Sequence, residues 1–204
     1  MTKVRDAWLS WYNTARAQNG LKPYVYNEAL NETAANWSFY SEKKGSIDHK
    51  RAGQKSYYDY KKVGAWFASK GVTFATRTSG NSDYVENIGW DYYSCSKADC
   101  TDDLIASIKS TYNFFIGEKN KKYRAHYESI MNKSYHEIGM GIAVDPAKKK
   151  YYLTVHYGTD VIVPKDNAAC TVPAGNAVPS LASSTGNSVI SVPALVDVQG
   201  AHKF

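Results

Sequence analysis

The sequence predicts an α+β fold, a three-layer α-β-α sandwich in which helices cover both faces of a small central antiparallel sheet. Two observations predict it: segments with helical periodicity come first, and two alternating segments typical of a hairpin come near residue 150. The chain has 204 residues, of which 43% are hydrophobic, so it can fill one well-packed core. We therefore expect one globular domain with an appendage.

Two helices are expected in the first quarter of the chain. Residues 4–19 repeat apolar side chains at helical spacing, and Asn19-Gly20 favours the left-handed turn that ends a helix. A second helix is expected to begin after Asn27, an N-cap residue, and to end at Gly45 behind two lysines. Residues 63–67 have the composition of a further short helix, and residues 76–82 are rich in turn formers.

A later helix is expected to begin near Thr101, where two aspartates favour the positive end of a helix dipole. Its apolar stripe, extended by three residues from Phe115, reaches Glu118. A carboxylate on the core-facing stripe at a helix C-terminus is disfavoured by the dipole and by loss of water. We therefore expect Glu118 to have a cationic or metal partner.

The hairpin is expected at the end of the domain. Residues 137–145 alternate bulky side chains with Gly139, Gly141 and an alanine, which predicts a strand with one thick and one thin face. After a turn that contains a proline, residues 151–157 alternate again, so the two segments are expected to pair antiparallel. The thin face would let a helix lie close against the sheet.

The composition changes at residue 163. Residues 163–204 are rich in Pro, Ser, Ala and Val and carry little charge, which is typical of a linker or a C-terminal extension. Residues 190–198 have the composition for one more strand.

Charge and hydropathy argue against a nucleic-acid-binding surface and against a membrane span. The formal net charge of +6 comes from short lysine clusters at turns and helix ends, without the basic stripe and interleaved aromatics of a nucleic-acid surface. No segment reaches the roughly 18 to 20 apolar residues of a membrane span. Residues 1–20 also lack the apolar stretch of a signal peptide, so an exported protein would have had its signal removed.

Cysteine usage suggests an exported protein. Cys95 and Cys100 lie close together in a polar segment, where a small local disulfide is expected, and two free thiols are the alternative. Cys170 is left over, and could pair with another chain, with a partner beyond this sequence or with nothing.

The candidate site residues are histidines and carboxylates near predicted element ends. His49 and His126 are expected in loops beside helices, and Glu86 is an acid within an apolar segment. Together with Glu118 they form the imidazole and carboxylate set that binds Zn²⁺ or a similar divalent ion. The other histidines are weaker candidates: His202 is in the tail, while His136 and His156 are interpreted as hydrogen-bonded strand residues.

Several short motifs resemble those of the CAP superfamily, the cysteine-rich secretory, antigen-5 and pathogenesis-related group with its SCP-like domain. They follow the family order over roughly residues 5 to 160: Tyr12-Asn-Thr-Ala-Arg16 with Gly20-Leu-Lys-Pro23, Asp48-His49, Glu86-Asn87-Ile88, Phe115-Ile-Gly-Glu118, His126-Tyr127 and Glu137-Ile-Gly-Met-Gly141. The resemblance implies a CAP domain over residues 1–162 and a central cleft where His49, Glu86, Glu118 and His126 meet.

This sequence also departs from the family pattern. Val85 stands where a glycine usually precedes the glutamate, Phe115 replaces a tryptophan, and the last strand lacks the usual Pro-Gly-Asn ending. These departures resemble a bacterial-type member.

The resemblance implies a secreted or extracellular binding protein. We expect its cleft to hold a divalent metal, with Zn²⁺ as the leading candidate, through His49 and His126 while Glu86 and Glu118 orient them or act as ligands. A small lipid, a glycan or a host or cell-surface protein is the expected partner. One alternative is a metal-dependent, peptidase-like hydrolase in which Glu86 or Glu118 is the catalytic base. The chain has neither a His-Glu-x-x-His nor a Gly-x-Ser-x-Gly motif, which favours binding. The other alternative is a structural scaffold without a ligand.

Overall fold

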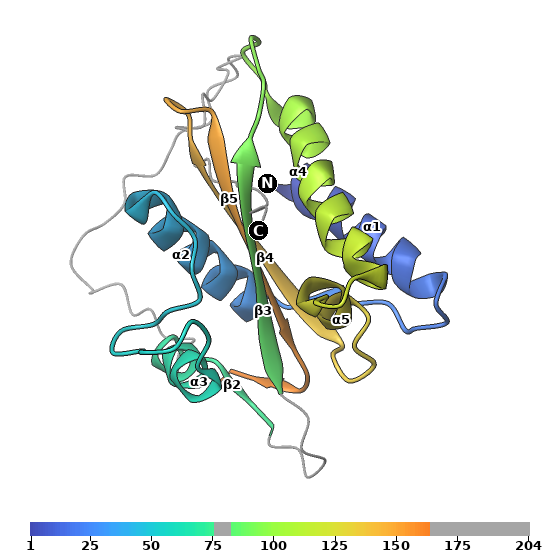
Figure 1. Ribbon diagram of the computed structural model, residues 1–204, viewed down its shortest axis with the longest axis vertical. Helices are drawn as coiled ribbons and strands as arrows, with labels where there is room; N and C mark the ends of the chain where they lie inside the picture. Colours follow the sequence, from blue (N-terminus) through green and yellow to red (C-terminus); the bar gives the residue numbers. More distant parts are fainter. Residues whose placement is uncertain (76–82, 164–204) are drawn as a thin grey trace, which may run out of the picture.

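A central sheet lies between two layers of helices in the computed structural model, which describes residues 1–75 and 83–163 (Figure 1). On one side of the sheet lie α2 (Glu28–Lys44) and α3 (Tyr60–Ser69). On the other lie α1 (Thr2–Ala17), α4 (Thr101–Ile116) and α5 (Ala125–Ile130), with the short 3-10 helix η1 (Gly117–Asn120) after α4. The three-layer α-β-α sandwich expected from the sequence is confirmed.

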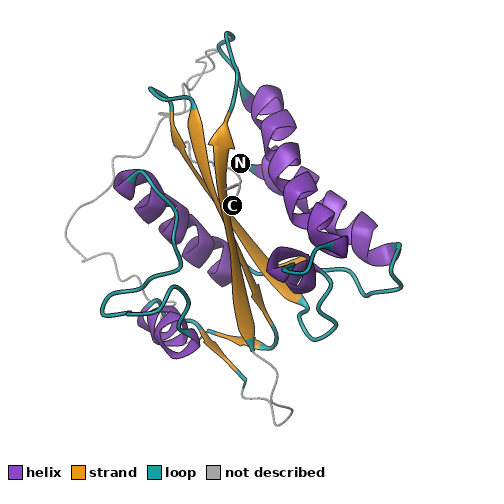
Figure 2. Ribbon diagram, in the orientation of Figure 1, coloured by secondary structure: helices purple, strands orange, loops and turns teal. Residues whose placement is uncertain are grey.

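The sheet is antiparallel except at one edge. Within the described residues its strand order is β1-β4-β5-β3, formed by Val25–Tyr26, Glu137–Asp145, Lys150–Gly158 and Tyr84–Tyr92 (Figure 2). β4 and β5 form the predicted antiparallel hairpin. The two-residue β1 pairs parallel to β4, which the expectation of an antiparallel sheet did not include. A second small sheet pairs β2 (Thr73–Phe74) with β6 (Val161–Ile162).

The helices begin and end close to the expected residues. α2 has Asn27 as its N-cap, whose side chain accepts a hydrogen bond from the Leu30 amide, and it ends at Gly45 in the left-handed conformation. The helix expected over 4–19 begins two residues earlier and ends at Ala17, because residues 18–20 already form the turn that terminates it. The helix expected at 63–67 is longer, since Asp59 caps it at the N-terminus.

α2 packs directly on β4 because β4 is thin on that face. A Cβ atom at Gly139 would lie 2.0 Å from the carbonyl carbon of Leu30, and one at Gly141 would lie 2.0 Å from the amide nitrogen of Ala35. These glycines therefore bring the α2 backbone against the sheet, as the alternating sequence predicted.

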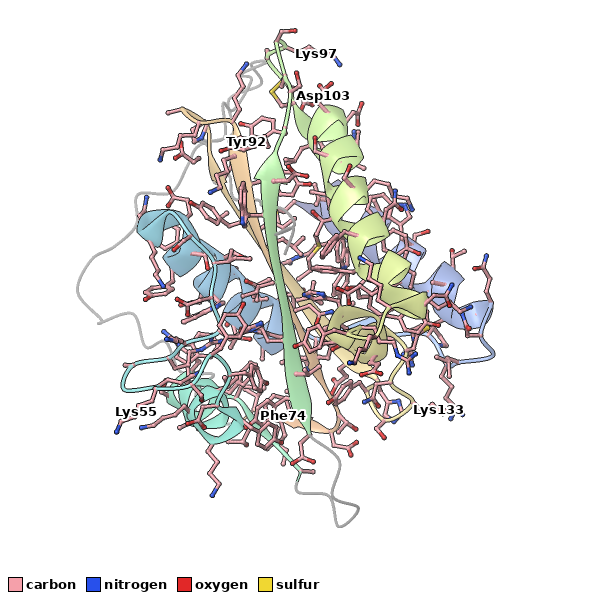
Figure 3. The ribbon with its side chains drawn as sticks, viewed as in Figure 1. Lys55, Phe74, Tyr92, Lys97, Asp103 and Lys133 are labelled. Carbon is pink, nitrogen blue, oxygen red and sulfur yellow. A yellow bond between two sulfur atoms is a disulfide. The ribbon has the colours of Figure 1, made fainter. Side chains whose placement is uncertain are left out.

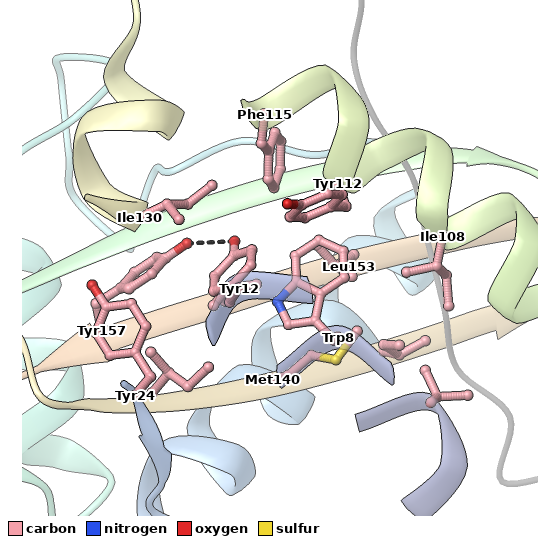
Figure 4. Packing of buried hydrophobic residues seen from close by; sticks show 14 of the residues in the cluster. Trp8, Tyr12, Tyr24, Ile108, Tyr112, Phe115, Ile130, Met140, Leu153 and Tyr157 are labelled. Carbon is pink, nitrogen blue, oxygen red and sulfur yellow. Dashed lines mark hydrogen bonds between the residues drawn. The ribbon is translucent and has the colours of Figure 1, made fainter. Parts of the chain in front are cut away.

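An aromatic core fills the space between the sheet and the layer of α1 and α4. Trp8 and Tyr12 of α1 contact Tyr112 of α4, and the Tyr12 hydroxyl lies 2.6 Å from that of Tyr157 on β5 (Figure 4). Much of the tyrosine and tryptophan content thus serves packing.

Cys95 and Cys100 form a disulfide, confirming the pairing expected from their spacing. The loop they close precedes α4, beside the exposed Lys97–Asp103 ion pair (Figure 3).

No described helix has the length and apolarity to cross a membrane. Residues 76–82, Cys170, the strand expected over 190–198 and His202 lie outside the described residues, and the boundary at residue 163 stays a prediction.

Candidate functional site

The four candidate side chains come from different elements, and three of them line one cavity. His49 lies in the loop after α2, Glu86 on β3 and Glu118 in η1. The loop position expected for His126 is wrong, because residues 125–130 form α5 and His126 lies in its first turn. His49, Glu86 and His126 line a cavity of about 550 Å³, within the range of roughly 300–1,000 Å³ typical of small-ligand sites. Glu118 joins the site through His126, to which it is hydrogen-bonded. In Figure 1, β3 passes between the loop that follows α2 and helix α5.

Each histidine is held by one glutamate through the same ring nitrogen. Nδ1 of His49 lies 2.8 Å from Oε1 of Glu86, and Nδ1 of His126 lies 2.9 Å from Oε1 of Glu118. Oε2 of Glu118 also accepts a hydrogen bond from the His126 amide, and the Phe115 ring stacks on the His126 ring at 4.3 Å. Because an ionised carboxylate only accepts hydrogen bonds, each Nδ1 carries the proton. Nε2 is then the nitrogen with a lone pair for a ligand.

Two further residues, Arg51 and His156, complete the surroundings of Glu86. The guanidinium of Arg51 donates from Nη2 to Oε2 at 2.5 Å and from Nη1 to Oε1 at 3.3 Å. His156 Nε2 lies 2.8 Å from Oε2, from the strand position directly opposite Glu86. All four acceptor positions of this carboxylate are therefore filled, counting the hydrogen bond from His49.

Sequence reasoning missed the contribution of these two residues. His156 was expected to be a hydrogen-bonded strand residue, and it is, but its partner belongs to the site. Residues 84–92 were not predicted as a strand. Had they been, the pairing of Glu86 with His156 across the sheet would have identified His156 as a site residue. Arg51 was not singled out. Its guanidinium lies 3.3 Å from the Trp37 ring centre and 4.4 Å from that of Trp66, so residues distant in sequence hold it.

The charges around Glu86 are balanced internally. Burial alone would raise the pKa of Glu86, but the charge of Arg51 and the hydrogen bonds from the two histidines outweigh it, so the pKa lies well below its usual value. Burial lowers the pKa of His156, which is therefore neutral and donates through Nε2. Burial likewise opposes ionisation of Glu118, and the hydrogen bonds from His126 overcome it and lower that pKa. Both glutamates are thus carboxylates at neutral pH.

The donor set fits a metal held by two imidazoles better than one held by four protein ligands. Across residues 1–75 and 83–163, no group of three or more His, Cys, Asp or Glu side chains is arranged to hold an ion. The hydrogen bonds occupy the oxygens of Glu86 and leave Nε2 of His49 and His126 as the available donors beside the cavity. Glutamates in this position orient ligands, as residues behind a metal-bound histidine commonly do.

Aromatic and aliphatic side chains form most of the remaining cavity wall. Tyr57 and Tyr58 contact the His49 ring edge-on, with ring centres 5.1 and 5.3 Å from it. The rest of the wall includes Ile47, Val85, Ile88 and Tyr123. His136, the other histidine considered among the described residues, is exposed directly before β4 and does not line the cavity.

Comparison with known proteins agrees with this fold. The sequence model of the cysteine-rich secretory protein family, CAP, matches residues 9–157. No curated protein sequence is similar enough to count as a match. Among solved structures, an outer surface protein from Borrelia burgdorferi superposes with a TM-score of 0.52 at 11% identity, covering 78% of this chain and 93% of that one.

Two other similar structures belong to longer chains. The CAP domain of enterococcal PrgA has a TM-score of 0.49 at 15% identity, covering 72% of this chain and 56% of that one. An extracellular protein containing a SCP domain from Bacillus anthracis str. Ames has a TM-score of 0.44 at 14% identity, covering 78% of this chain and 40% of that one. At such identities the likeness concerns the fold alone.

Proposed function

The chain belongs to the CAP family of cysteine-rich secretory proteins, and from that membership and the geometry of its cavity we propose that it is an extracellular binding module. Its cavity holds a divalent ion, best matched by Zn²⁺, through Nε2 of His49 and His126. Bound there, the ion would supply open coordination positions for a ligand. The disulfide, and the outer-surface location stated for the similar Borrelia burgdorferi protein, support an exported protein.

One observation carries the metal proposal: both histidines line the same cavity, and each is held at Nδ1 by a glutamate. Glu86 and Glu118 each bind Nδ1, so both imidazoles keep a lone pair on Nε2. Neutral imidazole with an oriented Nδ1–H is the usual form of a zinc-binding histidine. A polar network that served folding alone would have no need to leave two nitrogens available beside a cavity.

The same geometry favours binding over hydrolysis. A general base needs a lone pair that can reach the proton it removes. Both oxygens of Glu86 accept hydrogen bonds from Arg51 and the histidines, and both oxygens of Glu118 accept from His126. Glu86 therefore has no acceptor position left for a water molecule, and Glu118 does not line the cavity.

Calorimetric titration of Zn²⁺ tests the proposal. Wild type should bind one ion per chain, the double variant His49→Ala/His126→Ala should lose that binding, and His136→Ala should keep it, because His136 is exposed away from the cavity. Equal affinity in wild type and the double variant would refute the metal site.

A further inference from the structure

β3 is an edge strand of the sheet, and its outer edge is open. In the strand order β1-β4-β5-β3, β5 is its one neighbour among the described residues. Directly after β3, the amide of Tyr93 donates to the carbonyl of Lys149, which identifies the odd-numbered residues as those that bond to β5. The direction of hydrogen bonding alternates along a strand, so the amides and carbonyls of Glu86 and Ile88 point away from β5.

The cavity lies along this open edge. Residues 85–88 line it, and Glu86 is 3% exposed although its side chain is fully buried, so its accessible atoms belong to the main chain. No described residue forms a hydrogen bond with the amide or the carbonyl of Glu86 or Ile88. Unpaired main-chain groups at the edge of a sheet are a template for one more strand.

The length of the cavity and its two walls suit an extended peptide. Residues 85–88 extend over about 10 Å, the length of roughly three peptide residues. Neighbouring side chains of β3 point to opposite faces of the sheet: Glu86 contacts His49, and Asn87 donates to the His126 carbonyl. The side chains of an added strand would alternate in the same way, one toward the His49 wall and the next toward the His126 wall.

Each wall carries an exposed tyrosine. Tyr57 is 50% exposed and comes from the segment before α3, while Tyr123 is 76% exposed and comes from the segment before α5. Exposed aromatic rings give rigid contact area at low entropic cost. Apolar side chains of a bound peptide could therefore pack against both rings.

The charge beside the cavity favours acidic ends on that peptide. Lys50 and Lys122 each adjoin a residue that lines the cavity, and both are exposed. Neither forms an ion pair within residues 1–75 and 83–163, whereas the carboxylates of Asp48 and Glu128 already pair with other basic side chains. Carboxylates that flank the bound segment would complement these two lysines.

From these observations we propose that the cavity binds an extended peptide segment of another protein, which joins the sheet as a further strand beside β3. The inference rests on the proposed function, because that function makes the cavity a binding site, but the main-chain hydrogen bonds that it uses need no metal ion. It selects the protein among the lipid, glycan and protein partners expected from the sequence.

The test uses the full chain and short synthetic peptides that carry aspartates at both ends and every combination of Val, Ile, Tyr, Thr and Ser between them. At least one should bind in calorimetry with EDTA present. Each binder is then made with N-methyl groups on one or the other alternate set of its residues. Methylation of the set whose amides face β3 should weaken binding about fivefold for each hydrogen bond lost, and methylation of the other set should leave it unchanged.

Two tyrosine variants provide a second measurement on the protein side. Tyr123→Ala should weaken binding about tenfold. Tyr92→Ala is the matched control and should not change it, because Tyr92 is 57% exposed but lies at the end of β3 outside the cavity (Figure 3). Exchanging the terminal aspartates of the peptide for lysines should weaken binding severalfold at low salt.

The possible failures can be told apart. Peptide binding that both methylated sets weaken equally, or that neither weakens, would overturn the pairing with β3, as would binding that disappears in EDTA. Zn²⁺ binding without binding of any peptide at millimolar concentration would overturn this inference and leave the metal proposal standing. Peptide binding by a chain that does not bind Zn²⁺ would contradict only the metal proposal. Sedimentation tests a second copy as the occupant: a dimer that Tyr123→Ala dissociates, without peptide binding, would also overturn the inference.

Discussion

Arg51 and Glu86 form a buried ion pair, with Nη2 of Arg51 2.5 Å from Oε2 of Glu86. Nη1 of the same guanidinium donates to the His49 carbonyl, and its face lies against Trp37. Glu86 in turn holds His49 and His156. Arg51 is thus a positioning residue that fixes the carboxylate on which the orientation of His49 depends, and a lysine could not reproduce its planar, two-point contact.

Removing Arg51 should destabilise the fold. Arg51→Leu leaves a buried carboxylate without its counter-ion, and such a loss typically costs about 3–5 kcal/mol. Urea unfolding measures it. The double variant Arg51→Leu/Glu86→Leu should lose less free energy of unfolding than the two single variants lose in sum, because no unpaired charge remains. A single-variant loss below about 1 kcal/mol would contradict the assignment of this pair as buried and charged.

Replacing Glu118, the acceptor that holds His126, should weaken metal binding without abolishing it. Glu118→Gln alters the group that fixes the His126 tautomer, and such changes typically weaken metal affinity about 10- to 100-fold. Glu128→Gln on α5 is the control, since Glu128 is exposed and pairs only with Arg124 among the described residues. Competition against a chelating zinc indicator measures both, and equal affinities in the two variants would argue against an orienting role for Glu118.

Stability should fall on acidification in two steps. The pKa of His156 is lowered by burial from its usual 6.5, so below that pH the unfolded chain takes up a proton that the folded protein does not. Despite burial, the charge of Arg51 lowers the pKa of Glu86 below its usual 4.5, so a second loss begins beneath that pH. In both cases stability is present above the unfolded-state pKa and lost as pH falls.

Thermal unfolding at about pH 7, 5.5 and 4, values chosen to bracket the two unfolded-state pKa values, checks this dependence. His156→Gln should reduce the fall in Tm over the first interval while leaving the later step in place. A wild-type Tm that does not change over that first interval would contradict a buried neutral His156.

Adding one methyl group to the thin face of β4 should be costly. Gly141→Ala would bring Cβ to 2.0 Å from the backbone of α2, so the helix must move, at a cost of about 1–3 kcal/mol. Gly117→Ala is the control, because Gly117 has helical backbone angles and no heavy atom within 4 Å of an added Cβ. The free energy of unfolding measured by chemical denaturation should be higher for Gly117→Ala than for Gly141→Ala. Equal values would contradict the close packing of α2 on the sheet.

The sequence was most informative where local chemistry determines local structure. Asn27 and Gly45 mark the ends of α2 because a side-chain cap and a left-handed stop are local requirements. The alternation with Gly139 and Gly141 predicted the face on which a helix would lie. Glu118 was expected to need a cationic or metal partner from its position alone, and its observed partner is His126, another candidate site residue.

The remaining features depend on contacts between distant residues. β3 was not predicted as a strand because Glu86 and Asn87 interrupt its apolar residues, and their burial depends on partners from other elements. Arg51 acquires its role only when Trp37, Trp66 and Glu86 surround it. β1 and β6 are two residues long, too short for any periodic pattern. The site therefore became complete only once the sheet register was known.

One metal ion should bind Nε2 of both His49 and His126. Crystals grown with Zn²⁺ and measured on both sides of the zinc absorption edge test it most directly. We expect an anomalous peak in the cavity within bonding distance of both Nε2 atoms, with Glu86 and Glu118 still hydrogen-bonded to Nδ1. A peak coordinated by the glutamate oxygens, or a cavity without a peak in crystals saturated with Zn²⁺, would contradict it.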